Sequence, residues 1–377
     1  MATPSNSVAQ VPRLTTEQIA QFKRDGFLVL PAVLDLELCR QTREQMWELI
    51  AEHRPSMKRD DPATWLPFSD EEREGYKRPE GGGDPYFGGG GHRLYIRNGA
   101  EELLLDLAPR AMFDIAEQLL GDGEVIWPNG LDETNTTIGP ALLTEDHITS
   151  MEVHLGPESD KWLGKATRKT EQLRLPKTGP VWATAQGSRG LYCTLPNSPG
   201  GRVNKYPYAK VQPSARYPSA HAAEGMYESR RRLQIAAYFD DLPLGAGGLH
   251  LWPGSHQRIW DRWSAMHRGD IPSNDDWLSL RHSAGKFDGY VTPPISEIKE
   301  DTPVVDTHGP CGSVVLWHAN MLHMAGQNTS SDIIRQATIY AYDKTEESLP
   351  DEQALAYPDG DLWRDWSDEL RATETAS

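Results

Sequence analysis

Short apolar runs punctuated by turns dominate the chain from about residue 124 onward, and they constrain the fold more than any other feature. The runs are rich in β-branched and aromatic residues, as strands are. They read EVIWP, GLYCTLP, LQIAAYFDD, GLHLWPG, SVVLWH and RQATIYAYD. Many short strands of this kind pack as an antiparallel sandwich or barrel. Because helical patterns precede the strands, we predict an α+β fold.

The N-terminal region carries the signals of helices. In LTTEQIAQFKRDG, Thr15 and Gln18 form a capping box, Leu14 and Ile19 fit a hydrophobic staple, and Gly26 ends the helix. A short buried strand, FLVLP, is expected next. Two further helices are predicted from DLELCRQTREQMWELIAEH and from PRAMFDIAEQLLG, the second with Pro109 at its start.

Several segments fall outside these patterns. Residues 78–91, RPEGGGDPYFGGGG, are too rich in glycine for a helix or strand and are expected to form a loop. Residues 258–305 form a long polar insertion between strands. We expect a flexible N-terminus (1–13), a single domain (14–345) and an acidic, tryptophan-containing tail (346–377) packed outside the core.

The charge balance and the cysteines limit the possible partners. The chain of 377 residues has 38 Lys and Arg against 55 Asp and Glu, a net charge of −17. This balance argues against nucleic acid or an anionic membrane as the main partner. No secretory signal and no 18-residue apolar run is found. Cys39, Cys193 and Cys311 lie far apart without a CxxC motif, as expected for buried thiols in a reducing compartment. We therefore expect a cytoplasmic protein with a small-molecule substrate and leave its oligomeric state open.

Two histidines and an arginine are the main candidates for chemistry. His221 follows a proline-rich loop, His323 follows a predicted strand, and Arg335 opens the next strand. Two histidines and one carboxylate on neighbouring strands form the facial triad of non-haem iron sites. A nearby arginine suits the far carboxylate of an α-keto acid. The alternative for each histidine is a surface or hydrogen-bonded core position.

Other polar residues have simpler interpretations. His256 is expected to be a structural hydrogen-bonding residue, and a pocket role for His250 stays open. The cluster of His147, Glu152 and His154 is expected to be a solvated loop. The arginines of ESRRRL are either a charged turn or a basic rim for an anionic substrate; they are Arg230, Arg231 and Arg232.

Several segments resemble, in the expected order, the phytanoyl-CoA dioxygenase family. They are LTTEQIAQFKRDGFLVLPAVLDLELC, RGLYCTLP, YFDDLPLGAGGLHLWPGSHQR and GSVVLWHANMLHMAGQNTSSDIIRQATIYAY. The Pro-Gly-Ser-His segment at 253–256 and the spacing from His323 to Arg335 are the more specific features. The resemblance spans residues 14–343.

The resemblance implies a fold, an activity and site roles. The family is a branch of the iron(II)/2-oxoglutarate-dependent oxygenases, with a double-stranded β-helix (jelly-roll or cupin-like) core and flanking N-terminal helices. His221 and His323 would bind iron(II), Arg335 would bind the cosubstrate 2-oxoglutarate, and Trp252 would line the cosubstrate pocket. The expected reaction is hydroxylation of a C–H bond in a small soluble substrate, with release of succinate and CO₂.

The chain departs from the family pattern at one iron ligand. The family motif is His-x-Asp, but Ala223 stands two residues after His221. Glu224 points to the opposite side of a regular strand and reaches the metal only through a bulge or turn, which Gly225 permits. We rank ligation by Glu224 first. The second alternative is a halogenase, in which chloride binds iron at Ala223, and the third is a non-catalytic β-helix protein that binds a small molecule.

Overall fold

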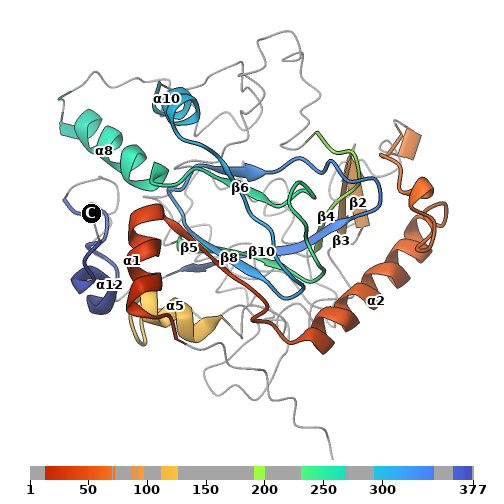
Figure 1. Ribbon diagram of the computed structural model, residues 1–377, viewed down its shortest axis with the longest axis horizontal. Coiled ribbons are helices and arrows are strands. Elements are labelled where there is room, and N and C mark those ends of the chain that lie inside the picture. The colour runs from red at the N-terminus through yellow and green to blue at the C-terminus, as the bar shows by residue number, and fades with distance from the viewer. Residues whose placement is uncertain are drawn as a thin grey trace, which may run out of the picture.

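A computed structural model describes residues 13–69, 71–72, 87–90, 92–96, 112–125, 191–199, 231–268, 270, 293–343 and 360–375. Its centre is a large antiparallel sheet (Figure 1). The strand order is β1-β8-β5-β10-β4-β3-β2. The strands span Phe27–Leu30 (β1), Phe87–Gly90 (β2), Arg93–Ile96 (β3), Leu191–Thr194 (β4), Arg231–Tyr238 (β5), Val314–His318 (β8) and Arg335–Asp343 (β10).

A smaller antiparallel sheet contains three described strands in the order β7-β6-β9. They span Leu249–Leu251 (β6), Val305–Asp306 (β7) and His323–Ala325 (β9). The chain passes from β5 in the large sheet to β6 and β7 in the small one, and then alternates through β8, β9 and β10. The predicted α+β class with antiparallel sheets is therefore correct.

Strand β8 shows how the large sheet separates two apolar cores. All five of its residues are buried, which requires packing on both faces. Val314 and Leu316 belong to a buried cluster that also includes residues of the helices, here called the outer core. Val315 and Trp317 belong to a second cluster, the inner core, which also includes Leu251 of the small sheet. Alternation along the strand thus assigns successive side chains to opposite cores.

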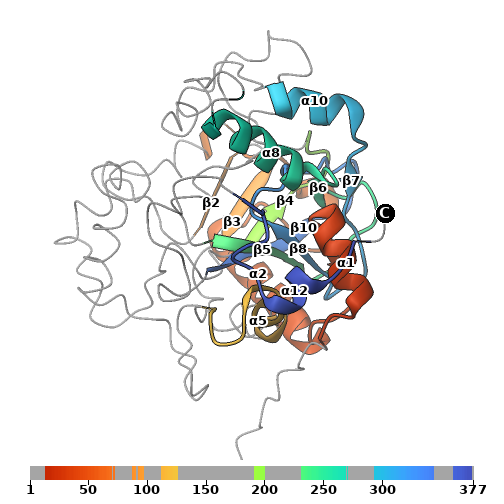
Figure 2. The same ribbon diagram turned by 90° about the vertical axis from the view of Figure 1, so that its left-hand side faces the viewer.

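Helices pack on both sides of these sheets. Figures 1 and 2 show α1, α5 and α12 close together and α8 and α10 near the small sheet, while α2 lies at the lower right of Figure 1, away from α1 and α12. The helices span Thr16–Asp25 (α1), Leu36–His53 (α2), Phe113–Leu120 (α5), Ser255–Arg268 (α8), Pro293–Asp301 (α10) and Asp368–Ala372 (α12), with a short 3₁₀ turn at Pro62–Thr64 (η1). No helix in the described ranges is long and apolar enough to cross a membrane.

The capping signals predicted for α1 are present. The Thr15 hydroxyl accepts a hydrogen bond from the Gln18 backbone, and the Gln18 side chain accepts one from the Thr15 backbone. Gly26 ends the helix with φ +83°. A Cβ at this glycine would collide with the buried His256 ring, so close packing as well as backbone conformation requires glycine here.

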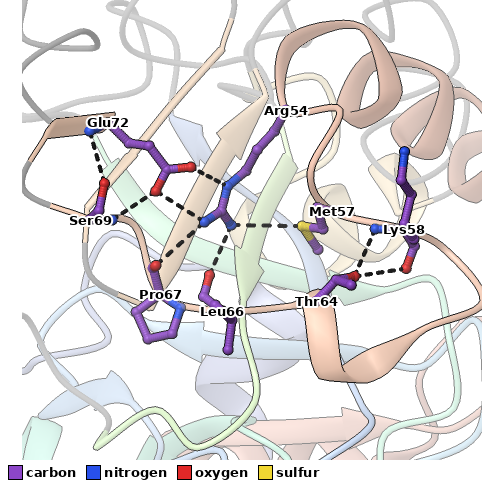
Figure 3. A network of polar contacts seen from close by, with 8 residues as sticks. All are labelled: Arg54, Met57, Lys58, Thr64, Leu66, Pro67, Ser69 and Glu72. Carbon is purple, nitrogen blue, oxygen red and sulfur yellow. Dashed lines mark hydrogen bonds and ion pairs between the residues drawn. The ribbon is translucent and has the colours of Figure 1, made fainter.

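The chain after α2 folds around one buried arginine (Figure 3). Arg54 is 5% exposed. Its guanidinium donates to the carbonyl of Leu66 at 2.9 Å and forms an ion pair with Glu72 at 3.0 Å. It also lies 4.1 Å from the centre of the Phe68 ring. These contacts fix the loop that leads away from α2.

Three expectations from the sequence need correction. Residues 87–90 form β2, because β3 supplies backbone partners that local glycine content does not reveal. Helix α5 begins at Phe113 rather than near Pro109, and Met112 precedes it without a side-chain cap; Pro109 itself lies outside the described residues. The segment 360–375 is not external, since Trp363 and Trp366 belong to the outer core. Their aromatic partners, including Phe22, are distant in sequence.

Candidate functional site

His323 opens β9 and faces the inner core. It pairs across the small sheet with Leu251, and its ring centre lies 5.3 Å from that of Trp317. His323 Nδ1 lies 2.8 Å from the Met321 carbonyl oxygen. A carbonyl can only accept a hydrogen bond, so this contact places a proton on Nδ1. A neutral His323 therefore carries its lone pair on Nε2, as a metal-binding histidine held by a backbone carbonyl does.

Arg335 opens β10 and is 7% exposed. It lies two residues before Ala337, an inner-core residue, and so faces the same side of the sheet. Its guanidinium donates to Thr194 Oγ1 at 2.7 Å and to the Tyr192 carbonyl at 3.2 Å. Strand β4 therefore orients a buried positive charge toward the space between the two sheets.

A tight turn at Gly247 packs against the Cβ of Arg335. Gly247 has φ +91°, and a Cβ there would lie 3.1 Å from Asn328 Cβ and 3.5 Å from Arg335 Cβ. Asn328 is fully buried and donates to the carbonyls of Thr194 and Ile333 at 3.1 and 2.8 Å. Glycine and asparagine thus allow the turn and the two strands to approach closely around the arginine.

Tyr238 is a site residue that the sequence reasoning missed. Its hydroxyl accepts from the Leu249 backbone N–H at 2.8 Å and lies 2.9 Å from Thr307 Oγ1, joining the two sheets. Burial raises the pKa of Tyr238, while the charge of Arg335 acts in the opposite direction. The alternation of β5 places Tyr238 on the face of Ala236, but no local motif indicates its hydroxyl partners.

The Pro-Gly-Ser-His segment supports the turn before His323. Ser255 Oγ accepts from the backbone N–H of Leu322 at 2.9 Å, and the Trp252 N–H donates to the Leu322 carbonyl at 3.3 Å. The Trp252 side chain is buried, and a cosubstrate role for it stays a prediction. Ser255 and the backbone of Trp252 therefore hold Leu322, the residue before His323, and His256 takes no part in these contacts.

His256 and His250 lie apart from this turn. His256 is fully buried, with Nε2 3.2 Å from the Lys23 carbonyl, and burial lowers its pKa to about 4. This contact agrees with the structural role expected for it. His250 lies on the face of β6 opposite to Leu249 and Leu251 and pairs with Asp306 at 3.5 Å. His250 therefore faces away from the inner core, which argues against the pocket role left open for it.

The remaining predicted ligands lie outside the described residues. These are His221, Ala223, Glu224 and Gly225, together with Arg230 and the cluster of His147, Glu152 and His154. Arg231 and Arg232 begin β5, and only the backbone of these two residues is described. Within the described part of the chain, no group of three or more His, Cys, Asp or Glu residues could hold a metal. The structure thus places His323 and Arg335 on inward faces, and the positions of the predicted ligands His221 and Glu224 lie outside the described residues.

A family model and several solved structures match the chain. The model described as Phytanoyl-CoA dioxygenase (PhyH) matches residues 157–337, a range that includes all five predicted site residues. No curated protein sequence matches.

Among solved structures, EctD from S. alaskensis with 2-oxoglutarate and 5-hydroxyectoine has 14% identity and a TM-score of 0.40, covering 91% of this chain and 86% of that one. The non-heme alpha ketoglutarate dependent carbocyclase SnoK from nogalamycin biosynthesis has 13% identity and a TM-score of 0.37, covering 88% and 84%. AviO1 from Streptomyces viridochromogenes Tue57 has 16% identity and a TM-score of 0.35, covering 90% and 97%.

Proposed function

We propose that this chain, whose residues 157–337 match the phytanoyl-CoA dioxygenase family model, is an iron(II)/2-oxoglutarate-dependent oxygenase. The observation that carries the proposal is the orientation of His323, whose Nδ1–H contact with Met321 directs the coordinating lone pair to Nε2. Imidazole is a suitable ligand for iron. The described residues therefore fit the metal that the family implies.

Each site residue has a distinct task in this proposal. His221 and His323 hold iron(II), and Arg335 binds the far carboxylate of 2-oxoglutarate. Two acceptors on β4 fix the arginine, so that it is oriented before the cosubstrate arrives. Trp252 lines the cosubstrate pocket. When bound, iron(II) and 2-oxoglutarate supply oxygen activation coupled to the release of succinate and CO₂, and the inner core excludes water around them.

The proposed scaffold is a double-stranded β-helix with flanking N-terminal helices. Two observations support it: both described sheets are antiparallel, and successive strands from β7 to β10 alternate between them. A site between the sheets of a closed core places metal ligands from different strands around one centre.

The completing ligand is proposed to be Glu224. Replacing it in Glu224→Ala should weaken iron binding and abolish succinate formation, because a charged ligand is lost. Ala223→Asp in the same background should restore part of both, since aspartate then stands two residues after His221 on the same side of the strand. Unchanged iron binding in Glu224→Ala would exclude Glu224 as a ligand.

A second function, halogenation, is favoured by one observation, the alanine at position 223. Chloride at this place would supply the negative charge of the missing carboxylate. Turnover should then require chloride or bromide and persist in Glu224→Ala, whereas Ala223→Asp should shift the product from halogenated to hydroxylated. Turnover that is independent of halide would contradict this alternative.

The substrate is proposed to be a small molecule hydroxylated at a C–H bond, and an anionic one if Arg230, Arg231 and Arg232 border the pocket. Charge reversal at these positions should raise the KM for the substrate much more than the KM for 2-oxoglutarate. Equal changes in the two KM values would remove the argument for an anionic substrate.

A further inference from the structure

Two of the three cysteines lie together on the side of the large sheet covered by α2. Cys39 is in the second turn of α2 and is fully buried. Cys311 is in the turn that precedes β8 and is partly exposed, packing against the outer core that contains Cys39. The Cys311 backbone N–H donates to Asp241 at 2.8 Å, so this turn is fixed to the loop that follows β5.

Arg43 holds a positive charge against this pair. It follows Cys39 by one helical turn and therefore shares its face of α2. Its Nη1 donates to the Phe239 carbonyl at 2.6 Å and to Cys311 Sγ at 3.3 Å. The Asp240 carboxylate lies 3.8 Å from the guanidinium. The arginine is thus fixed by a backbone acceptor while it contacts the sulfur.

The two thiols differ in their acidity. The pKa of Cys311 is lowered to about 7, first by a hydrogen bond with Cys39 and also by Arg43, against the opposing effect of burial. The pKa of Cys39 is raised, first by the same hydrogen bond and then by burial. A low-pKa thiolate next to a protonated thiol is the arrangement of a reactive cysteine with its resolving partner.

We propose that Cys311 and Cys39 form a thiol modification site that a peroxide oxidises to a disulfide between α2 and the turn before β8. The Cys311 thiolate attacks one oxygen of the peroxide, the O–O bond breaks, and the second oxygen leaves with a proton as water or an alcohol. Cys39 sulfur then attacks Cys311 sulfur, and the S–O bond breaks. The departing hydroxide takes the Cys39 proton to form water, so two thiols and one hydrogen peroxide give one disulfide and two waters.

A cavity lies beside Arg43 on this side of the protein. It has a volume of about 410 Å³ and is lined by Arg43, Trp47, Asp240 and Asp241, among other residues. The site is separate from His323 and Arg335, which face the inner core on the other side of the sheet. Oxidation of the thiol pair therefore does not depend on the oxygenase chemistry.

Hydrogen peroxide titration of the full-length protein, followed by peptide mass spectrometry, tests the proposal. The wild type should lose two hydrogen atoms and yield a Cys39–Cys311 cross-linked peptide that thiol reductant removes. Cys39→Ser should stop at a sulfenic acid on Cys311 that a dimedone probe captures, and Cys311→Ser should form neither product. Cys193→Ala is the matched control: burial raises the pKa of Cys193 to about 12, so its removal should leave cross-linking unchanged.

The contribution of Arg43 is measured by the rate of cross-linking. Arg43→Gln should slow it by about threefold at pH 7, because the contribution of Arg43 to the lowered pKa of Cys311 is lost while the hydrogen bond with Cys39 remains, whereas Arg43→Lys should retain most of the rate. Circular dichroism of each variant checks that it is folded. Equal rates in wild type and folded Cys311→Ser, or a disulfide that involves Cys193 instead, would overturn the proposal.

Discussion

At the residue scale, Arg335 combines burial with a fixed orientation, and this makes its replacement informative. Lysine keeps the charge but cannot reproduce a planar, bidentate contact with a carboxylate. We expect Arg335→Lys to raise the KM for 2-oxoglutarate by about 10- to 100-fold, as measured by succinate formation over a range of 2-oxoglutarate concentrations. Arg258→Lys, at a surface pair with Asp301, is the control and should change little. An unchanged KM in Arg335→Lys would contradict the assigned role.

His256 should make stability depend on pH. Its pKa in the folded protein is lowered to about 4 by burial, below the value of an unfolded histidine, so the unfolded chain binds more protons between about pH 6.5 and 4. The contribution of neutral His256 to the free energy of unfolding is therefore fully present above pH 6.5 and is lost as the pH falls through this window. We expect the loss to amount to about 3 kcal/mol and to be reduced in His256→Gln.

The measurement for this prediction is urea unfolding at pH 7 and at pH 4.5. The hydrogen bond with the Lys23 carbonyl and the charge of Asp25 act in the opposite direction on the pKa of His256, and the His318 ring lies 5.6 Å from the His256 ring. His308→Gln, at an exposed position, is the control. If His256→Gln keeps the full pH dependence of the wild type, other groups are responsible for it.

At the scale of single elements, helix α1 illustrates a structure determined by local sequence. Its capping box, its apolar face and its terminal glycine are all close neighbours along the chain, and the predicted bounds agree with the structure. Thr15→Ala should lower the free energy of unfolding by about 1 kcal/mol, because the cap to the Gln18 N–H is lost. Thr16→Ala, at the exposed first helical residue, should change it little. Chemical denaturation measures the free energy of unfolding of both variants. An equal decrease in both would exclude a capping effect.

Strand β2 shows what local sequence does not determine. Its residues, Phe87–Gly90, have low strand propensity, and their strand conformation depends on pairing with β3. The same limit applies to the candidate site. His323 and Arg335 were singled out by motif and spacing. Tyr238 was missed and the contact made by Ser255 was not predicted, because their partners, Leu249 and Leu322, are brought near by the fold.

At the scale of the whole molecule, the C-terminal segment completes the outer core. Trp366 is buried, lies 5.6 Å from Phe22 of α1 and stacks 5.1 Å from His318 of β8. The acidic composition of the tail predicted an external position, but the two tryptophans find apolar partners that only the tertiary fold supplies. The average composition of a segment does not indicate that individual tryptophans within it are buried.

Loss of this contact should destabilise the whole domain. Trp366→Ala removes a large buried ring and should lower the free energy of unfolding by about 3–5 kcal/mol, seen as a lower midpoint in both urea and thermal unfolding. Glu374→Ala, at an exposed position of the same segment, is the control. A midpoint equal to that of the wild type in Trp366→Ala would show that the segment does not stabilise the fold.

Iron retention by the purified protein decides whether His221 and His323 form an iron site. The chain, loaded with iron(II) without oxygen and then desalted, should retain about one iron per chain, as expected for a single facial-triad site, while His221→Ala and His323→Ala should each lose most of it. His308→Ala, which removes an exposed histidine, should retain the wild-type content. A wild type that retains no iron, or full retention in both His221→Ala and His323→Ala, would contradict the account.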